Sequence, residues 1–144
     1  MKIVIIGLGT IGRTILKSLS AEGHTITIID EDKNKIETLI EKYDVSGVVG
    51  NGACLDIQKE AGVRSADIAI ALTNSDELNV FVCLVAKKLG VTDVITHVGY
   101  LPEVAASTEY IQLVTTLKDV ANYAKNNGQY FCRQKRQQVD GEGL

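Results

Sequence analysis

A glycine-rich turn lies between the first apolar segment of the chain, residues 2–6, and a following stretch of helical period. Its sequence is Gly7-Leu8-Gly9-Thr10-Ile11-Gly12. In a strand–turn–helix unit Gly7 permits the tight turn, Gly9 lets the backbone approach a pyrophosphate, and Gly12 lets the helix pack closely on the strand. The free N–H groups and positive dipole at the helix N-terminus then face the phosphates. The motif in this context favours a dinucleotide-binding βαβ unit.

Apolar runs rich in Val and Ile alternate with helical periods along the rest of the chain. We expect strands at residues 2–6, 25–29, 46–49, 68–72, 94–98 and 111–115, and helices at 11–21, 33–43, 55–61, 76–89 and 102–107. This order predicts an α/β fold, a Rossmann-like, doubly wound, mainly parallel six-stranded sheet with helices on both faces. Gly23, Gly62 and Gly90 follow predicted helices, where glycine most easily makes a left-handed C-cap.

Three regions follow from this pattern. We expect a nucleotide-binding domain over residues 1–116, a linker helix over 117–130 and a polar tail over 131–144. The linker helix carries an apolar stripe with no assigned partner in the core, and we interpret it as a candidate dimerisation surface, the alternative being that it packs on its own sheet. The stripe consists of Leu117, Val120, Ala121 and Ala124.

Composition excludes several classes of protein. The 144 residues include 15 Lys and Arg against 18 Asp and Glu, a net charge of -3, which disfavours binding to nucleic acid. No apolar run approaches the length needed to span a bilayer, so direct membrane insertion is not expected. Three cysteines without CxxC spacing argue against a disulfide scaffold or a structural zinc site. The chain begins without a signal-peptide pattern, and a cytoplasmic location is expected.

An acidic residue stands where a ribose would lie. Asp30 follows Gly12 by 18 residues at the end of the second predicted strand, from where its carboxylate can accept hydrogen bonds from ribose hydroxyls. A carboxylate there repels a 2′-phosphate, so NAD is favoured over NADP, although Arg13, Lys33 or Lys35 would weaken this preference if one reached the same spot. ATP, ADP and AMP carry the same adenosine and stay open as ligands.

The loop after the third predicted strand is a second candidate region. Asn51 has the donor and acceptor to read an adenine edge, and Gly52 and Ala53 are small enough for a base to lie against them. The alternative is a simple strand-to-helix turn. Cys54 is either a reactive thiol at a helix N-terminus or, the interpretation we favour, a residue that caps or packs.

The loop after the fourth predicted strand forms a third region, where the second half of a dinucleotide would arrive. Thr73 and Asn74 are candidate contacts to the distal phosphate or ribose. Ser75 or Asp76 can instead serve as a helix cap without a ligand role.

We find no apparatus for catalysis. His24 precedes the second predicted strand, at the edge of the sheet away from the crevice. His97, near the end of the fifth predicted strand, could face the ligand, although a lone histidine is more often structural. No Ser-His-Asp order, P-loop or metal-ligand spacing occurs. We therefore predict no catalytic and no metal-ligating residues.

Five segments resemble the N-terminal nucleotide-binding domain of TrkA proteins, also called the KTN or RCK domain. They are residues 1–12, 28–32, 49–53, 60–67 (Glu-Ala-Gly-Val-Arg-Ser-Ala-Asp) and 71–79 (Ala-Leu-Thr-Asn-Ser-Asp-Glu-Leu-Asn). The resemblance covers about residues 1–98. It implies a regulatory domain, not an enzyme, that binds NAD(H) or alternatively ATP/ADP and gates a potassium uptake transporter by a ligand-dependent conformational change. The implied partners are a membrane-embedded potassium translocating subunit, at the inner face of the cell membrane, and further copies in a homodimer or ring.

The resemblance also implies site residues and shows departures. It implies that the phosphates of the nucleotide are bound by Gly7, Gly9, Thr10, Ile11 and Gly12, and the ribose by Asp30. It also implies that the adenine side is bound by Glu31, Asn51, Gly52 and Ala53, and the distal part of the nucleotide by Leu72, Thr73 and Asn74. Relatives that sense the γ-phosphate of ATP often have Arg at the position of Thr10, and many have Arg at that of His97. The family's C-terminal ligand-binding domain has no counterpart in this sequence. Two alternatives stay open: the cofactor half of a small NAD-dependent oxidoreductase, and a redox sensor that controls something other than potassium.

Overall fold

The computed structural model describes residues 1–96. The predicted helix at 102–107, strand at 111–115, linker helix at 117–130 and polar tail at 131–144 lie outside the described residues, as does His97. The expectations placed on them, including the dimerisation stripe, therefore stay predictions.

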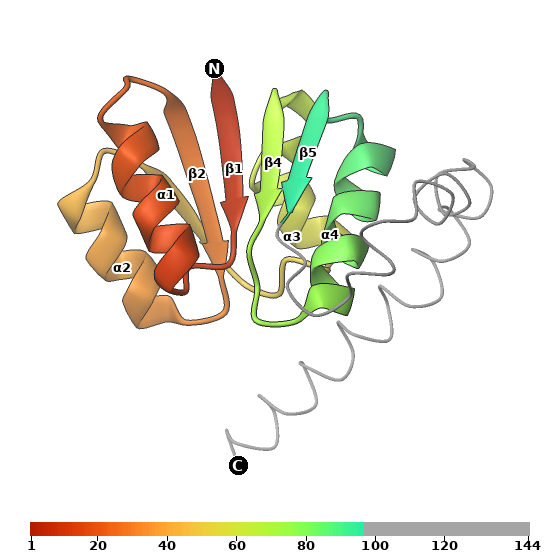
Figure 1. Cartoon of the computed structure of the whole chain (residues 1–144), viewed down its shortest axis with the longest axis horizontal. Helices are drawn as coiled ribbons and strands as arrows, with labels where there is room; N and C mark the ends of the chain where they lie inside the picture. Colours follow the sequence, from red (N-terminus) through yellow and green to blue (C-terminus); the bar gives the residue numbers. More distant parts are fainter. Residues whose placement is uncertain (97–144) are drawn as a thin grey trace, which may run out of the picture.

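Five parallel strands form the sheet in the described part of the chain (Figure 1). They are β1 (Lys2–Ile6), β2 (Thr25–Asp30), β3 (Ser46–Val49), β4 (Ile68–Ala71) and β5 (Asp93–Thr96), in the spatial order β3-β2-β1-β4-β5. Ile6 pairs with Ile29 on one side and with Ala71 on the other, so the three central strands end at the same edge. The predicted doubly wound, parallel fold is confirmed, with five of its strands described.

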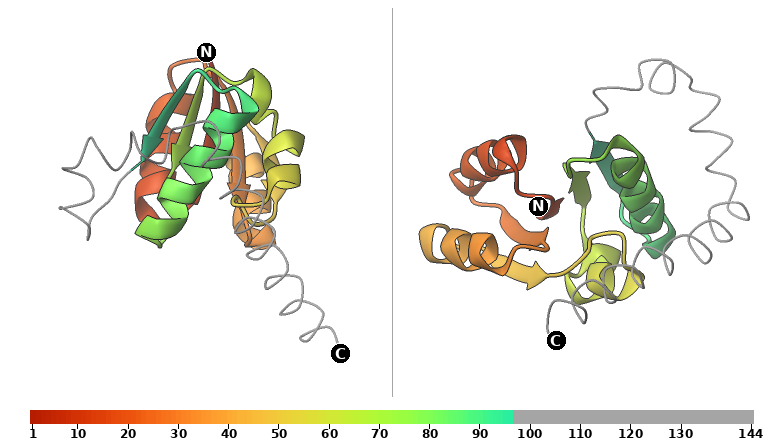
Figure 2. Two further views of the ribbon diagram at one scale, coloured as in Figure 1. Left: turned by 90° about the vertical axis from the view of Figure 1, so that its right-hand side faces the viewer. Right: turned by 90° about the horizontal axis from the view of Figure 1, so that it is seen from below.

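Helices cover both faces of this sheet (Figure 2). They are α1 (Thr10–Ser20), α2 (Lys33–Lys42), α3 (Leu55–Glu60) and α4 (Asp76–Leu89), with a short 3-10 helix, η1 (Val63–Ser65), after α3. The sequence predicted the four α-helices to within one residue at each end and missed η1. Gly23, Gly62 and Gly90 have φ of +79°, +79° and +110°, which confirms the left-handed glycine caps.

Two apolar clusters hold the layers together, one on each face. Ile3 and Ile5 of β1 pack with α1 and α2, whereas Val4 and Ile6 pack with α3, η1 and α4, because alternate residues of a strand point to opposite faces. Ile5 and Ile6 are both essentially unexposed. Burial of each such side chain stabilises the fold by about 1.5–3 kcal/mol, so β1 is held from both sides.

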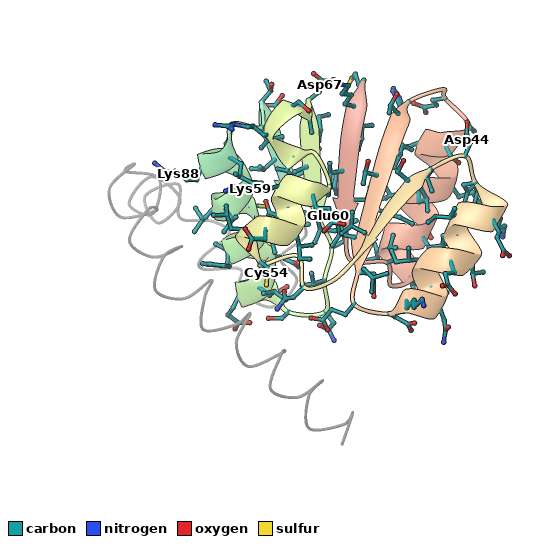
Figure 3. The ribbon with its side chains drawn as sticks, turned by 180° about the vertical axis from the view of Figure 1, so that it is seen from behind. Asp44, Cys54, Lys59, Glu60, Asp67 and Lys88 are labelled. Atoms are coloured by element: carbon teal, nitrogen blue, oxygen red, sulfur yellow. The ribbon has the colours of Figure 1, made fainter. Side chains whose placement is uncertain are left out.

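The topology determines where a ligand can bind. From β1 the chain winds outward through β2 to β3 and then returns across β1 to β4, so the winding direction reverses between β1 and β4. The loops after these two strands diverge at the carboxyl edge and leave a crevice between them. His24 and Asp67 lie at the opposite, amino edge, where Asp67 accepts a 2.7 Å hydrogen bond from Lys2 N (Figure 3). The expectation that His24 is remote from the crevice is confirmed.

The two cysteines within residues 1–96 lie in different environments. Cys83, in α4, is a free thiol only 8% exposed, and burial raises its pKa to about 12. Cys54 occupies the N-cap position of α3 without a side-chain cap hydrogen bond. Within residues 1–96 no helix is long and apolar enough to cross a membrane, and no cluster of His, Cys, Asp or Glu is suited to a metal ion.

Candidate functional site

A pocket of about 770 Å³ opens at the carboxyl edge of the sheet, where the loops after β1, β3 and β4 meet the end of β2. Except for Gly12 and Ala53, every residue that the sequence proposed for the site lines it. The further lining residues are Ile6, Leu8, Ile29, Lys35, Gly50, Ser75, Glu77 and Leu78. Segments far apart in the sequence are thus brought to one cavity.

The N-terminus of α1 faces this pocket without a partner of its own. Gly9 is its N-cap and offers no side chain, and the first turn contains no acidic residue. By contrast, Asp32 caps α2 through the N–H groups of Asn34 and Lys35, Ser75 caps α4 through that of Leu78, and α3 has an acid in its first turn. Within residues 1–96, α1 is therefore the α-helix whose N-terminal donors and dipole are left for an anion.

The turn requires glycine at positions 7, 9 and 12 for three different structural reasons. Gly7 has a φ of +96°, and a Cβ there would lie 2.5 Å from the carbonyl oxygen of Leu72. A Cβ on Gly12 would lie 2.1 Å from the carbonyl oxygen of Gly7, so α1 packs as closely on the strand as the motif predicts. Gly12 is buried beneath the pocket and does not line it. A Cβ on Gly9 would meet no described atom within 4 Å, so the space above this residue is open.

Asp30 supports the glycine turn as well as facing the pocket. Its Oδ2 accepts a 2.8 Å hydrogen bond from Leu8 N, and its Oδ1 accepts one of 2.9 Å from Asp32 N. Each carboxylate oxygen retains acceptor capacity for a ribose hydroxyl. Gly50 N donates to the carbonyl of Asp30 at 2.9 Å, which joins the end of β2 to the next loop.

The loop after β3 combines a pocket residue with a core residue. Asn51 Oδ1 accepts a 2.9 Å hydrogen bond from Ala53 N, so the amide NH₂ of Asn51 is the group that remains to read a base. Ala53 is fully buried in the core and does not line the pocket, which corrects its placement in the site. Gln58 of α3, which the sequence analysis missed, donates from Nε2 to the carbonyl of Gly52 at 2.8 Å.

A second missed residue, Asn79 in α4, fixes the loop after β4. Its Oδ1 accepts from Thr73 N and from Thr73 Oγ1, both at 2.7 Å, and its Nδ2 donates to the carbonyl of Thr73 at 3.3 Å. Asn79 is 2% exposed and does not line the pocket, so it acts through Thr73. The available signal was a polar residue among the apolar positions of α4.

The ionisable side chains around the pocket are unequally distributed. Asp30, Glu31 and Lys35 lie on the β2–α2 side, and Glu77 lies on the β4–α4 side. Lys35 is half-buried and forms no ion pair with another described residue, whereas Lys33 pairs with Glu37 at 3.6 Å on the exposed face of α2. Arg13 folds back onto the carbonyl of Gly9 and does not line the pocket.

These features define a class: a doubly wound α/β domain with a crevice at its switch point, a helix N-terminus there with neither a side-chain cap nor an acidic first turn, and a carboxylate at the end of β2. The profile of the TrkA-N domain matches residues 3–119. The chain belongs to the TrkA-N domain family, as the sequence resemblance indicated.

Curated relatives have the same family name. The chain is 41% identical over 86 residues to the Trk system potassium uptake protein TrkA of Vibrio alginolyticus, an alignment that covers 60% of this chain and 19% of that protein. The chain thus spans about a fifth of the length of such relatives.

Solved structures share the fold. The TrkA-N domain of the inner membrane protein ybaL from Escherichia coli superposes with a TM-score of 0.69 at 22% identity, covering 79% of this chain and 82% of that one. The GsuK channel bound to NAD gives a TM-score of 0.61 at 22% identity, covering 72% of this chain and 19% of the other. GsuK bound to ADP gives 0.65 at 24% identity, covering 79% and 29%.

Proposed function

We propose that this chain is a regulatory nucleotide-binding domain that binds NAD(H), or alternatively ATP/ADP, in the crevice between the β1–α1 and β4–α4 loops. Its partner is a membrane-embedded potassium translocating subunit, beneath which it works at the cytoplasmic face in a homodimer or ring. The observation that carries the proposal is the N-terminus of α1, which lines the pocket with neither a cap nor an acidic first turn.

The geometry supports a nucleotide in one orientation. A pyrophosphate fits over Gly9, where the space is open, and takes the free N–H groups of the first turn of α1. The adjoining ribose then lies at Asp30, and the base lies towards Asn51 and Gly52. The other half of a dinucleotide extends over the β4–α4 loop.

The potassium role rests on family membership and on the names of the relatives. Curated relatives are named Trk system potassium uptake proteins, and the fold is shared with the GsuK channel solved with NAD and with ADP. A ligand can gate such a partner only by binding one arrangement of the assembly more tightly than another. In this chain, Gly7 packs directly on the Leu72–Thr73 peptide, and Asn79 ties that peptide to α4, so displacement of the glycine loop is passed to a helix.

Calorimetric titration with NADH, NAD⁺, ATP, ADP and NADPH tests the proposal. We expect NAD(H) to bind and NADPH to bind more weakly, because the Asp30 carboxylate repels a 2′-phosphate. Asp30→Ala is expected to weaken NADH binding about tenfold or more, the value of hydrogen bonds to a charged acceptor. Preference for ATP or ADP would instead make the domain a sensor of energy charge, and failure of every nucleotide to bind would refute the proposal.

Asp67→Ala is the matched control for Asp30→Ala. Asp67 also accepts a backbone hydrogen bond through its carboxylate, from Lys2 N at 2.7 Å, but lies at the amino edge of the sheet (Figure 3). Asp30→Ala loses two backbone hydrogen bonds and Asp67→Ala loses one, and only Asp30→Ala is expected to lose nucleotide affinity. Steady hydride transfer from NADH to a small-molecule acceptor would contradict the non-enzymatic assignment.

A further inference from the structure

We infer that the distal half of the pocket, at the N-terminus of α4, selects a cationic group over an anionic or neutral one, with Glu77 as the specificity-determining residue. The domain then binds the oxidised dinucleotide NAD⁺ in preference to NADH. This inference deepens the proposed function and depends on it.

The two helix N-termini at the pocket differ in charge. The N-terminus of α1 has no side-chain cap and no acid in its first turn, so it attracts a phosphate. That of α4 is capped by Ser75 and carries Asp76 and Glu77 in its first turn. These carboxylates offset the positive end of the α4 dipole, so an anion is attracted to the N-terminus of α1 and not to that of α4.

Glu77 is held at the pocket by its neighbours. Its Oε2 accepts a 3.1 Å hydrogen bond from Ser75 Oγ, which in turn accepts from Leu78 N at 3.2 Å. Ser75, Glu77 and Leu78 all line the cavity, and Lys35, the one cation that residues 1–96 contribute to the lining, lies on the β2–α2 side. Within the described part of the chain, the pocket wall at the N-terminus of α4 thus presents a carboxylate with no basic residue beside it.

The orientation of a bound dinucleotide follows from the contacts on the other side. With the pyrophosphate at α1 and the adenosine ribose at Asp30, the nicotinamide half is directed over Leu72, Thr73 and Asn74 towards Glu77. The nicotinamide ring carries a positive charge in NAD⁺ and none in NADH. In ATP the same direction is taken by the γ-phosphate, whose negative charge Glu77 repels.

The ratio of the NADH and NAD⁺ dissociation constants tests this inference directly. At about 20 mM salt we expect NAD⁺ to bind about three- to fivefold more tightly than NADH, the value of an exposed ion pair at low ionic strength. In Glu77→Gln the ratio is expected to fall to about one, because the side chain keeps its size and loses its charge, whereas Glu77→Asp is expected to retain a ratio above one.

Glu60→Gln is the matched control. Glu60 is an exposed glutamate at the last position of α3, away from the pocket lining, and its substitution removes the same charge from the molecule (Figure 3). Glu60→Gln is expected to keep the ratio of the unaltered chain. Equal affinity for the two forms, preference for NADH, or a ratio unchanged in Glu77→Gln would overturn the inference and leave the proposed function standing. Binding of neither form would overturn both.

Discussion

At the scale of single residues, the polar side chains around the pocket mostly shape loops. Asp30 receives backbone N–H groups from Leu8 and Asp32, Asn51 receives one from Ala53, and Asn79 receives one from Thr73. Each bond fixes a turn that no helix or sheet ladder would hold. The ligand-facing surface is therefore defined by residues that are partly or wholly engaged before a ligand arrives.

Asn79→Ala is expected to weaken nucleotide binding through loss of the Thr73 contacts. The substitution leaves Thr73 N–H without its acceptor in a part-buried position, at a cost of about 1–3 kcal/mol in the free energy of unfolding. Val85→Ala, at a buried apolar position of the same helix, serves as the control. Both variants are expected to have a lower Tm, and only Asn79→Ala a weaker affinity by calorimetry. Equal affinity in the two variants would remove the positioning role from Asn79.

At the scale of elements, α1 is the feature around which the site is built. Its N-cap, Gly9, leaves open space above the helix, whereas at Gly12, one turn later, any Cβ would collide with the carbonyl of Gly7. The N-terminal end of α1 thus combines Gly9, which leaves room for a phosphate to approach the helix, with Gly12, which lets the helix pack closely on β1.

Gly9→Ala and Gly12→Ala are expected to separate these two requirements. A Cβ at Gly9 meets nothing described within 4 Å, so this variant is expected to lose about 1 kcal/mol or less of stability and to exclude the pyrophosphate. A Cβ at Gly12 lies 2.1 Å from a backbone oxygen, so that variant is expected to lose both stability and binding. Thermal melts and titrations of the pair provide the check. Unchanged affinity in Gly9→Ala would contradict the placement of the phosphates.

The elements of the fold were predictable because their patterns are local. The Val and Ile run of β1, the glycine turn and the glycine caps each determine the backbone conformation of the residues next to them. The short helix η1 was missed because three residues carry no periodicity. Ala53 was misplaced because nothing local tells a small residue beneath a loop from one on its surface, and its full burial depends on packing between β1, α3 and α4.

The supporting residues of the site were less predictable for the same reason. Asn79 reaches six residues back along the chain, and Gln58 joins the carbonyls of Gly52 and Val82 from separate elements. The direction of such side chains is set by tertiary packing. The sequence indicated which loops meet at the crevice, because strand order determines that, and did not indicate which buried amides hold them.

At the scale of the whole molecule, two apolar clusters hold β1 from both faces, and the reversal of winding beside it opens the crevice. The pocket is lined by residues at and just after the carboxyl ends of β1, β2, β3 and β4. Under the proposed function, a nucleotide bound there would contact both halves of the doubly wound sheet, and its binding free energy would favour one arrangement of the proposed assembly over another.

Mapping amide chemical shifts of the ¹⁵N-labelled chain during titration with NAD⁺ tests the central claim most directly. We expect the largest changes at the N–H groups of Leu8, Thr10, Ile11 and Gly12, with a second group at Thr73, because these line or underlie one crevice. Residues at the amino edge, such as His24 and Asp67, are expected to keep their positions. No change at saturating nucleotide, or changes centred on the amino edge, would contradict the assignment of this crevice as the nucleotide site.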